Sequence, residues 1–405
     1  MRILLCSNYP VFTGSGGAEK VFWEMGDHFA SEGNDVMCLG FEKGADPEKP
    51  SFHPHGDLVK TVNPGRHYKK SLAVQLLAAL LFFCPQTRRR VRDSLEGKRK
   101  GQLIKSELDA FRPDVIVSFQ IDMTYILRHS IKTRIPLITT LHCDIDTLLK
   151  GKQRMYKALE GSDAIVVLMR SYLEDLKRYL KDTSKAVFIP NVVPQLKGTF
   201  DNSARVIVGA GRICHQKNQL LAIKAFAIFG KSHPDWILRF YGDTSYDKEY
   251  FALCKKEAIA LGVDDRVFFM GTTKRLHEEI LKASIFAFPS VFEGFSLALT
   301  EAMALGMPCV CLKTCSGITE LIEDGKNGIL SDPNPESYAK MLINLANNNE
   351  RRLELGKMAR ESMEQYSPRK VYGIWSRILG DVSSLCLGNQ SKISQATLFS
   401  HRSLE

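Results

Sequence analysis

Short apolar runs alternate with amphipathic segments along most of the chain. In the first half these runs lack the polar alternation of a half-exposed strand, which predicts strands buried on both faces of a parallel sheet. Helical spacing of apolar residues separates them at Ala18–Ser31 and Ser171–Leu180. The predicted strands of this half are Arg2–Ser7, Asp35–Leu39, Asp114–Phe119, Pro136–His142, Ala164–Met169 and Ala186–Pro190.

The second half repeats the alternation. We expect strands at Arg205–Gly209, Ile237–Tyr241, Val267–Met270, Ile285–Pro289, Pro308–Leu312 and Gly328–Leu330. We expect helices at Gln216–Phe229, Asp247–Leu261, Arg275–Lys282, Leu297–Leu305, Ile318–Glu323, Pro335–Asn347, Glu350–Gln365 and Pro368–Leu379. Strand–helix alternation over two segments of this size predicts an α/β protein with two doubly wound, Rossmann-like domains.

The length of 405 residues also favours two domains, because one hydrophobic core rarely fills so long a chain. We place the join near Asn191–Pro194, ahead of a polar connector. The predicted divisions are an N-terminal domain 1–192, a C-terminal domain 193–365, a helix 366–383 that could pack back on the N-terminal domain, and a frayed tail 384–405.

The net charge of +10 is concentrated in one segment. Residues 60–105 hold twelve Lys and Arg against two acids, Asp93 and Glu96, and the rest of the chain is balanced. Inside this segment Leu72–Cys84 is apolar but shorter than the roughly 20 residues that span a bilayer. Basic flanks around a short apolar stretch favour contact with an anionic membrane surface. The alternative is a core helix with solvated flanks. Nucleic-acid binding is disfavoured because no aromatic residues interleave the basic runs.

The cysteines indicate a reducing compartment. No signal peptide is visible at the N-terminus, and the ten cysteines include no Cys-x-x-Cys pair. Cys309, Cys311 and Cys315 cluster, but their spacing suits neither a zinc site nor a disulfide framework. We therefore expect buried, reduced thiols in a cytoplasmic protein, and no metal site.

Two glutamates stand out at the end of a predicted strand. In Phe288–Pro308 (FPSVFEGFSLALTEAMALGMP), Glu293 falls in the loop after the strand and Glu301 lies on the following helix. Ligands bind at the carboxyl ends of strands in open α/β sheets. A carboxylate on the helix can accept two hydrogen bonds from a ribose diol, and one in the loop can lie beside a reacting sugar carbon. As isolated glutamates they would be an ordinary turn residue and an exposed helix charge.

A glycine-rich turn follows the first strand of the second half. Its sequence, Gly209–Asn218 (GAGRICHQKN), places Arg212 and Lys217 beside a helix start. Arginine gives bidentate contacts to phosphate and lysine a point charge, so the turn suits a diphosphate.

Together these motifs resemble those of the family 4 glycosyltransferases, which have the GT-B fold of two Rossmann-like domains facing each other across a cleft. The resemblance implies an acceptor-binding N-terminal domain, a nucleotide-sugar-binding C-terminal domain, retention of anomeric configuration and no need for a metal or other cofactor. It is weakest at 41–106 and in the tail. Arg212 and Lys217 would neutralise the donor diphosphate, Glu301 would hold the ribose and Glu293 would lie against the donor sugar. The amides of Gly294, Phe295, Ser296 and Leu297 would bind the sugar hydroxyls.

The resemblance extends to two N-terminal segments. The loop Tyr9–Lys20 contains Gly16 and Gly17, which would lie near the donor phosphates; the alternative is a tight turn needed for packing. His142 would touch the donor sugar, so the expected catalytic residues are His142, Arg212, Lys217 and Glu293. Asp144 and Asp122 are weaker candidates in neighbouring strand-end loops.

The expected function is transfer of a hexose or N-acetylhexosamine, with UDP favoured over GDP as carrier, to a lipid-linked or polysaccharide acceptor in cell-envelope assembly. The expected location is the inner face of the cytoplasmic membrane. Two alternatives remain open: a sugar-nucleotide epimerase of the same fold, and a non-catalytic basic protein that binds membrane or nucleic acid.

Overall fold

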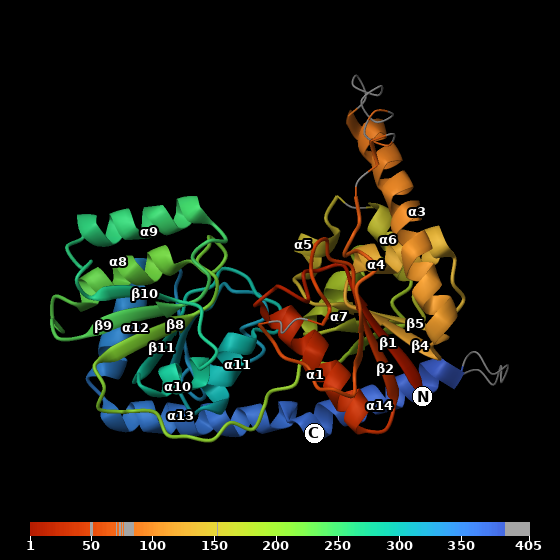
Figure 1. The fold of residues 1–405 in the computed structure, drawn as a ribbon. Coiled ribbons are helices and arrows are strands. Elements are labelled where there is room, and N and C mark those ends of the chain that lie inside the picture. The colour runs from red at the N-terminus through yellow and green to blue at the C-terminus, as the bar shows by residue number, and fades with distance from the viewer. Residues whose placement is uncertain are drawn as a thin grey trace. The chain divides into compact units, whose positions relative to one another are not determined.

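The computed structural model describes residues 1–48, 52–69, 71, 72, 74, 76, 85–151 and 153–384. The chain forms two compact units: a first unit of Met1–Ile189 with Ile374–Glu405, and a second unit of Pro190–Gly373 (Figure 1). The α14 helix (Pro368–Ser384) crosses the division between them. In the first unit, Trp375 of this helix lies edge-on against Phe29, with 6.4 Å between ring centroids.

The first unit is built on a parallel sheet in the order β3-β2-β1-β4-β5-β6-β7. Its inner strands are almost wholly buried, which explains their continuous apolar sequences. The strands are β1 (Arg2–Ser7), β2 (Asp35–Gly40), β3 (Lys60–Val62), β4 (Val115–Ser118), β5 (Leu137–Leu141), β6 (Ala164–Val167) and β7 (Ala186–Phe188).

Helices connect these strands. The α1 helix (Gly17–Ser31) is amphipathic and buries Val21, Phe22, Trp23 and further apolar residues. The others are α3 (Pro85–Phe111), α4 (Ile121–Tyr125), a π-helix (Ile126–Ile131), α5 (Ile145–Leu149), α6 (Gln153–Glu160) and α7 (Ser171–Leu176).

The second unit has a parallel sheet in the order β10-β9-β8-β11-β12-β13. Its strands are β8 (Val206–Ala210), β9 (Ile237–Tyr241), β10 (Val267–Gly271), β11 (Ile285–Phe288), β12 (Cys309–Leu312) and β13 (Ile329–Ser331). Its helices are α8 (Gln219–Phe229), α9 (Lys248–Ala260), α10 (Leu276–Leu281), α11 (Leu297–Ala304), α12 (Pro335–Ala346) and α13 (Asn349–Met363), followed by a 3₁₀ turn (Glu364–Tyr366). The fold class expected from the sequence, two Rossmann-like parallel sheets with helices, is confirmed.

The basic segment forms more structure than the sequence pattern predicted. Its second part is the long α3 helix, which buries Ile104, Leu108 and Phe111 in the core of the first unit. A Cβ atom on Gly101 would lie 3.2 Å from Ile131 and Ser130 of the π-helix, so this glycine permits close helix packing. The N-terminal turns of α3 extend away from the sheet (Figure 1).

The apolar stretch that precedes α3 lies mostly outside the described residues. Of its described members Leu72 and Leu76 are 74% and 66% exposed, while Val74 is buried. No described helix is both long enough and apolar enough to cross a bilayer. The tail from residue 385 onward, predicted to fray, also lies outside the described residues.

One predicted helix is wrong. Ile318–Glu323 is a series of turns, in which the amide of Ile318 donates to the Cys315 carbonyl and that of Leu321 to the Ile318 carbonyl. Gly317, with φ of +80°, redirects the chain immediately before it. The eight described cysteines are all free thiols, and all but Cys143 are buried.

Each sheet reverses its strand order once. The reversal falls between β1 and β4 in the first unit and between β8 and β11 in the second. In open α/β sheets ligands bind outside the carboxyl ends of the strands at such a switch point. The predicted site residues of the second unit follow β8 and β11, and those of the first unit follow β1 and β5.

Candidate functional site

The loops that follow β8 and β11 in the second unit are bound to each other. The Val291 amide donates to the Gln216 carbonyl at 2.9 Å, and the Gln216 side-chain amide donates to the Phe292 carbonyl at 3.0 Å. These bonds hold the Gly209–Asn218 turn against the segment that carries Glu293. Two motifs 76 residues apart in the sequence thus become one site.

Lys217 and Glu293 form the centre of this site. The Lys217 Nζ atom lies 2.6 Å from Glu293 Oε1, and the two side chains are only 13% and 8% exposed. The ammonium also lies 5.1 Å from the centroid of the Phe288 ring. Burying two charges is costly unless they are paired, so this pair fixes the positions of both groups.

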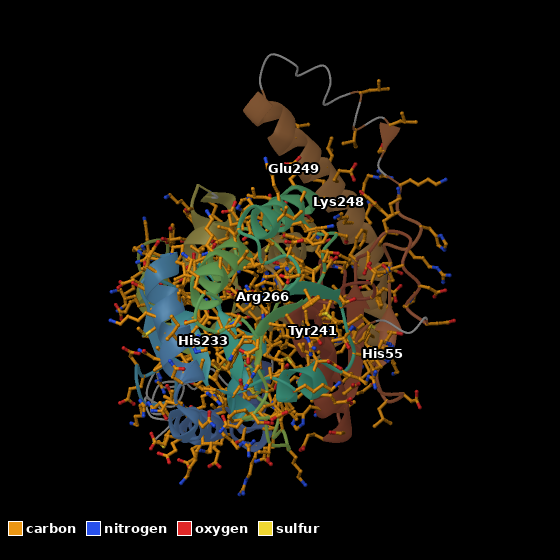
Figure 2. The ribbon with its side chains drawn as sticks, turned by 90° about the vertical axis from the view of Figure 1, so that its left-hand side faces the viewer. His55, His233, Tyr241, Lys248, Glu249 and Arg266 are labelled. Atoms are coloured by element: carbon orange, nitrogen blue, oxygen red, sulfur yellow. The ribbon has the colours of Figure 1, made fainter. Side chains whose placement is uncertain are left out.

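Backbone contacts between glycines bring the turn close to the neighbouring strand end. Gly242 follows β9 with φ of +155°, and a Cβ atom there would lie 1.9 Å from the Gly211 carbonyl oxygen. A Cβ atom on Gly211, with φ of +146°, would lie 3.1 Å from the alkyl chain of Lys217. The Gly211 amide donates to the carbonyl of Tyr241, which Figure 2 labels together with Lys248 and Glu249 at the start of α9. Only glycine fits this spacing.

Arg212 occupies the same turn but is exposed. Its guanidinium lies over the Tyr246 ring, 4.4 Å from the centroid. Arginine stacks readily on an aromatic face while its N–H groups remain available to an anion. The described contacts place Arg212 at the rim of the site, whereas Lys217 is at its centre.

The start of α11 offers hydrogen-bond donors beside Glu293. Ser296 is the N-cap residue, but its side chain makes no capping bond. The hydroxyls of Ser290 and Ser296 are buried, and neither meets a hydrogen-bond partner among the described residues. Buried hydroxyls in native proteins are nearly always bonded, so these two are available to a ligand. The N-terminus of a helix also attracts negative charge.

A third strand-end turn, Ser316–Gly317 after β12, packs against the segment that carries Glu293. The Glu293 amide donates to the Ser316 carbonyl, and a Cβ atom on Gly317 would lie 2.7 Å from the Gly294 carbonyl oxygen. The loop after β12 therefore fixes the backbone of the Glu293–Gly294 turn. Gly294 and Phe295 lead from this turn to the N-cap of α11, and Leu297 is the first residue of that helix.

Glu301 lies on α11, is only 5% exposed and accepts a hydrogen bond from His277. His277 Nε2 and Glu301 Oε2 are 2.8 Å apart. The histidine belongs to α10, and its side chain is 35% exposed. Glu301 is bonded to a residue of α10, whereas Glu293 pairs with Lys217 of the turn after β8, so the two carboxylates are held by different elements.

In the first unit the glycine loop is closed by a carboxylate. A Cβ atom on Gly16 would lie 2.4 Å from Glu19 Oε2, so the Glu19 side chain folds back against the loop. Gly16 is the N-cap residue of α1 and Gly17 its first residue. The loop is also fastened to the helix, because the indole N–H of Trp23 donates to the Val11 carbonyl at 2.8 Å.

His142 follows β5 and is held on two sides. Its ring stacks on Phe119, with 4.8 Å between centroids and 12° between planes. Its Nε2 atom lies 2.8 Å from the Thr140 hydroxyl. Burial lowers the pKa of His142 to about 4, so the imidazole is neutral near pH 7. A neutral imidazole can donate or accept a hydrogen bond but brings no charge.

The two weaker candidates of the first unit differ from each other. Asp144 is the N-cap residue of α5, where its carboxylate accepts from the Thr147 amide at 3.0 Å. Asp122 is exposed in the first turn of α4. Asp144 thus has a structural role that explains its position without a ligand.

Comparison with known families accounts for almost the whole chain. The model described as Glycosyltransferase Family 4 matches residues 15–195, and the model described as Glycosyl transferases group 1 matches residues 196–362. The chain belongs to the glycosyltransferases that these two models together describe. Membership confirms the resemblance drawn from the two strand-end motifs, which both fall inside the group 1 match.

Several curated relatives of the chain are named as glycosyltransferases. It is 31% identical over 43% of its chain to an uncharacterized glycosyltransferase of Haemophilus influenzae, covering 49% of that protein. It is 25% identical over 58% of its chain to the poly(glycerol-phosphate) alpha-glucosyltransferase of Bacillus subtilis, covering 35% of it. A Campylobacter jejuni N-acetylgalactosaminyltransferase, named for a diphospho-undecaprenol acceptor, is 28% identical over 44% of the chain and covered over 48%. The chain thus spans half or less of these relatives' length.

Solved structures share the fold of this chain over nearly its whole length. The sucrose-phosphate synthase of Thermosynechococcus elongatus matches with a TM-score of 0.74 at 17% identity, over 95% of this chain and 99% of that one. Anabaena HepE in complex with UDP-glucose matches with a TM-score of 0.69 at 16% identity, over 94% and 100%. At these identities the likeness establishes the fold.

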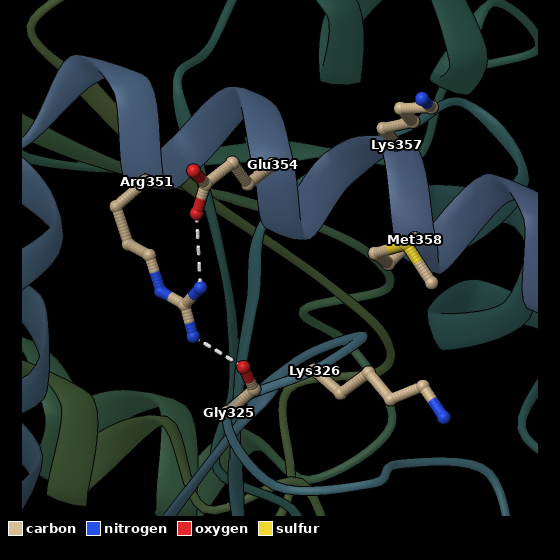
Figure 3. A pocket seen from close by; sticks show the side chains of 6 residues that line it. All are labelled: Gly325, Lys326, Arg351, Glu354, Lys357 and Met358. Carbon is tan, nitrogen blue, oxygen red and sulfur yellow. Dashed lines mark hydrogen bonds and ion pairs between the residues drawn. The ribbon is translucent and has the colours of Figure 1, made fainter.

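A hollow beside α13 is lined mainly by charged side chains. It has a volume of about 390 Å³ and lies between the turn at Gly325 and α13 (Figure 3). Its cations have acidic neighbours already: Arg351 pairs with Glu354 at 3.0 Å, and Lys326 with Glu323 at 2.7 Å. Within the described part of the chain, no three His, Cys, Asp or Glu side chains gather to hold a metal ion.

Sequence reasoning missed three contributors to the site. Gln216 and the Ser316–Gly317 turn act through hydrogen bonds that include their backbone carbonyls, which residue type does not reveal. His277 lies in a predicted helix without any motif, and only the distance to Glu301 identifies it. Gly317, five residues after the predicted strand Pro308–Leu312, was the one available indication of a tight strand-end turn.

Proposed function

We propose that the protein is a retaining glycosyltransferase that transfers a hexose or N-acetylhexosamine from a nucleotide diphosphate sugar, preferably a UDP sugar, to a lipid-linked or glycan acceptor. The observation that carries this proposal is the Lys217–Glu293 pair at the switch point of the second sheet, 2.6 Å apart and nearly buried. A cation, a carboxylate and a helix N-terminus at the carboxyl ends of neighbouring strands form a site for a charged phosphate attached to a hydroxylated sugar.

The cations and the helix would supply the catalytic stabilisation. As the anomeric bond breaks, negative charge grows on the leaving diphosphate. Lys217, Arg212 and the amides at the start of α11 would lower the energy of that charge, and such preorganised electrostatic stabilisation is usually the largest catalytic contribution. These groups would take the place of a divalent cation, so we expect activity in the presence of EDTA.

The carboxylates would recognise the sugar and the ribose. Glu293 would accept hydrogen bonds from donor-sugar hydroxyls, and the buried Ser296 hydroxyl lies on the same loop. Glu301 would accept from the ribose diol. We assign no covalent nucleophile, because retention can proceed by attack on the same face, with the donor phosphate accepting the acceptor's proton. His142, with its neutral ring, would serve as a hydrogen-bonding group rather than as a charged acid.

The favoured carrier and acceptor rest on relatives and on charge. HepE binds UDP-glucose in a solved structure of the same fold, and the Campylobacter relative is named for a diphospho-undecaprenol acceptor. The exposed Leu72 and Leu76 lie within the basic segment 60–105. Apolar side chains among cations suit the headgroup region of an anionic membrane, where a lipid-linked acceptor would be found.

A donor panel tests the activity. The purified protein is incubated with UDP and GDP sugars, with and without membrane lipid extract, and both nucleotide diphosphate release and the sugar product are measured. Transfer with an α-linked product from an α-linked donor supports the proposal. A rearranged donor sugar in the absence of acceptor would identify an epimerase. Absence of turnover with every donor would indicate a non-catalytic binding protein.

A matched pair of variants connects the activity to the site. Glu301→Ala should lower turnover at subsaturating donor by about a hundredfold, because two hydrogen bonds to the ribose are lost. Glu278→Ala is the control: Glu278 is on α10, 61% exposed and paired with Arg275. Equal activity of the two variants would remove Glu301 from the donor site.

Liposome flotation tests the membrane contact. Vesicles containing phosphatidylglycerol should bind the protein, and vesicles of phosphatidylcholine alone should not. The double change Leu72→Ser and Leu76→Ser should weaken binding severalfold, whereas Ile259→Ser, at a residue 63% exposed in the second unit, should not. Unchanged binding by the double variant would remove this segment from the membrane contact.

A further inference from the structure

The hydrogen bond between His277 and Glu301 joins a half-exposed group to a buried one. Glu301 is 5% exposed, and an ionised carboxylate can only accept hydrogen bonds. The His277 Nε2–H therefore donates to Glu301 Oε2 across the observed 2.8 Å. A charge-assisted bond of this length is among the stronger hydrogen bonds in proteins, and it fixes the rotation of the carboxylate.

His277 is itself held by a firmly attached helix. Glu279 of α10 accepts from the Tyr241 hydroxyl at 2.8 Å, which fastens the helix to the end of β9. At the other end of α10 the Leu281 carbonyl accepts from the Asp201 amide at 2.8 Å. The imidazole thus projects from an element fixed at two places, as required of a group that orients another one.

We propose that His277 is a positioning residue that holds the Glu301 carboxylate in the orientation that receives the donor's ribose hydroxyls. This role rests on the proposed function of Glu301 as the ribose acceptor. A carboxylate must present its lone pairs at defined angles to accept from two adjacent hydroxyls, and the Glu301 side chain has three rotatable bonds through which that orientation can change. His277 removes that freedom before the donor arrives, so less entropy is lost on binding.

The consequence is selectivity for the ribose rather than for the phosphates. Lys217 and Arg212 would act on the diphosphate from the turn after β8, whereas the hydrogen bond of His277 is made to Glu301. Losing His277 should therefore weaken only the part of the binding energy that depends on the ribose hydroxyls. A purely structural role would weaken the binding of every nucleotide alike.

Titration calorimetry with unmodified and deoxy nucleotides tests this inference. UDP and GDP are each compared with their 2′-deoxy and 3′-deoxy forms, on wild type, His277→Ala and His277→Gln. Wild type should bind the better nucleotide about tenfold more tightly than at least one deoxy form, and His277→Ala should lose that difference by binding the unmodified nucleotide roughly tenfold more weakly. His277→Gln should restore binding to within about threefold, because its amide N–H can replace Nε2–H.

The control is His233→Ala. His233, labelled in Figure 2, is a histidine of the same unit whose Nε2 lies 3.0 Å from Asn347 Oδ1, and its loss should leave nucleotide binding unchanged. Equal weakening of unmodified and deoxy nucleotides by His277→Ala would overturn the inference, as would failure of His277→Gln to restore the preference. Glu301→Gln separates the two levels: if it keeps the wild-type preference for ribose, Glu301 does not hold the ribose and both roles fall.

Discussion

The strand-end loops of the two units use polar residues in different ways. In the second unit, buried carboxylates of the elements that follow the strands have nitrogen partners from other elements: Glu293 pairs with Lys217, and Glu301 is bonded to the imidazole of His277. In the first unit, the corresponding strand ends carry the neutral ring of His142 and the helix-capping carboxylate of Asp144. Since buried charge is costly without a counterpart, the Lys217–Glu293 pair at the strand ends of the second unit is the reason we propose that the charged part of a substrate binds there.

The largest expected effect comes from removing the central cation. Lys217→Met should lower turnover by about a thousandfold, because it removes charge stabilisation from the leaving diphosphate, and should destabilise the protein by about 3 kcal/mol, because Glu293 stays buried without the ammonium. Adding Glu293→Gln should restore much of the stability but none of the activity. Turnover assays and urea unfolding measure the two quantities.

The control for this prediction is Lys224→Met. Lys224 is 41% exposed and pairs with Glu257 at 3.4 Å, so its loss should cost less than about 1 kcal/mol and leave turnover intact. If the double variant recovered activity together with stability, the pair would be a structural ion pair, and the contrast between the units would carry no functional meaning.

Glycines in the two units give the next prediction. Gly242→Ala places a methyl group 1.9 Å from the Gly211 carbonyl oxygen and should lower the free energy of unfolding by about 3 kcal/mol, because backbone must move. Gly16→Ala in the first unit meets the movable end of Glu19 at ordinary backbone angles, and should cost only about 0.5 kcal/mol. Thermal or urea unfolding measures the free energy of unfolding of both variants. Equal losses of stability in the two would contradict this contrast.

The sequence sufficed for the sheets because their strands are buried. The strand Arg2–Ser7 was placed to the residue, because the uninterrupted apolar run Ile3–Cys6 is typical of a strand buried on both faces of a parallel sheet. The same reasoning gave a wrong prediction at Ile318–Glu323. This segment has helical spacing of apolar residues, but Gly317 directs the chain into turns. The α3 helix was missed because its first half is highly charged and its apolar face is confined to the last turns, from Ile104 onward.

The sequence predicted which residues belong to the site better than it predicted how their side chains are arranged. Lys217 and Glu293 were assigned to one pocket from their strand-end positions, and the structure brings their charged atoms together. Arg212 was given the same weight, yet it stacks on Tyr246 at the exposed rim. The roles of these residues toward a donor stay predictions. Partners such as His277 depend on side-chain distances across two helices, which no pattern in one sequence encodes.

The neutral ring of His142 gives a pH-dependent prediction. The pKa of His142 is lowered from 6.5 to about 4, so the unfolded chain binds the proton at a higher pH than the folded one. The contribution of His142 to the free energy of unfolding is therefore fully present above pH 6.5 and is lost as the pH falls toward 4. Partial exposure of the ring reduces the expected loss to about 2 kcal/mol. Wild type should therefore lose more stability between pH 7 and pH 4 than His142→Gln. Equal losses would mean that the ring accepts a proton readily, and a charged histidine in the first unit would erase the contrast.

The smallest effect is expected at Asp144, and it decides how the first unit uses its carboxylates. Asp144→Ala removes the bond to the Thr147 amide and should cost about 1 kcal/mol of stability, as loss of an N-cap usually does. Asp144→Asn keeps an accepting oxygen and should cost only a few tenths of a kcal/mol. Both variants should retain turnover within about twofold when assayed below their unfolding temperatures, because a capping bond does not require charge. Loss of turnover in Asp144→Asn, at unchanged stability, would show that the charge itself acts on a substrate, and the first unit would then share the chemistry assigned here to the second.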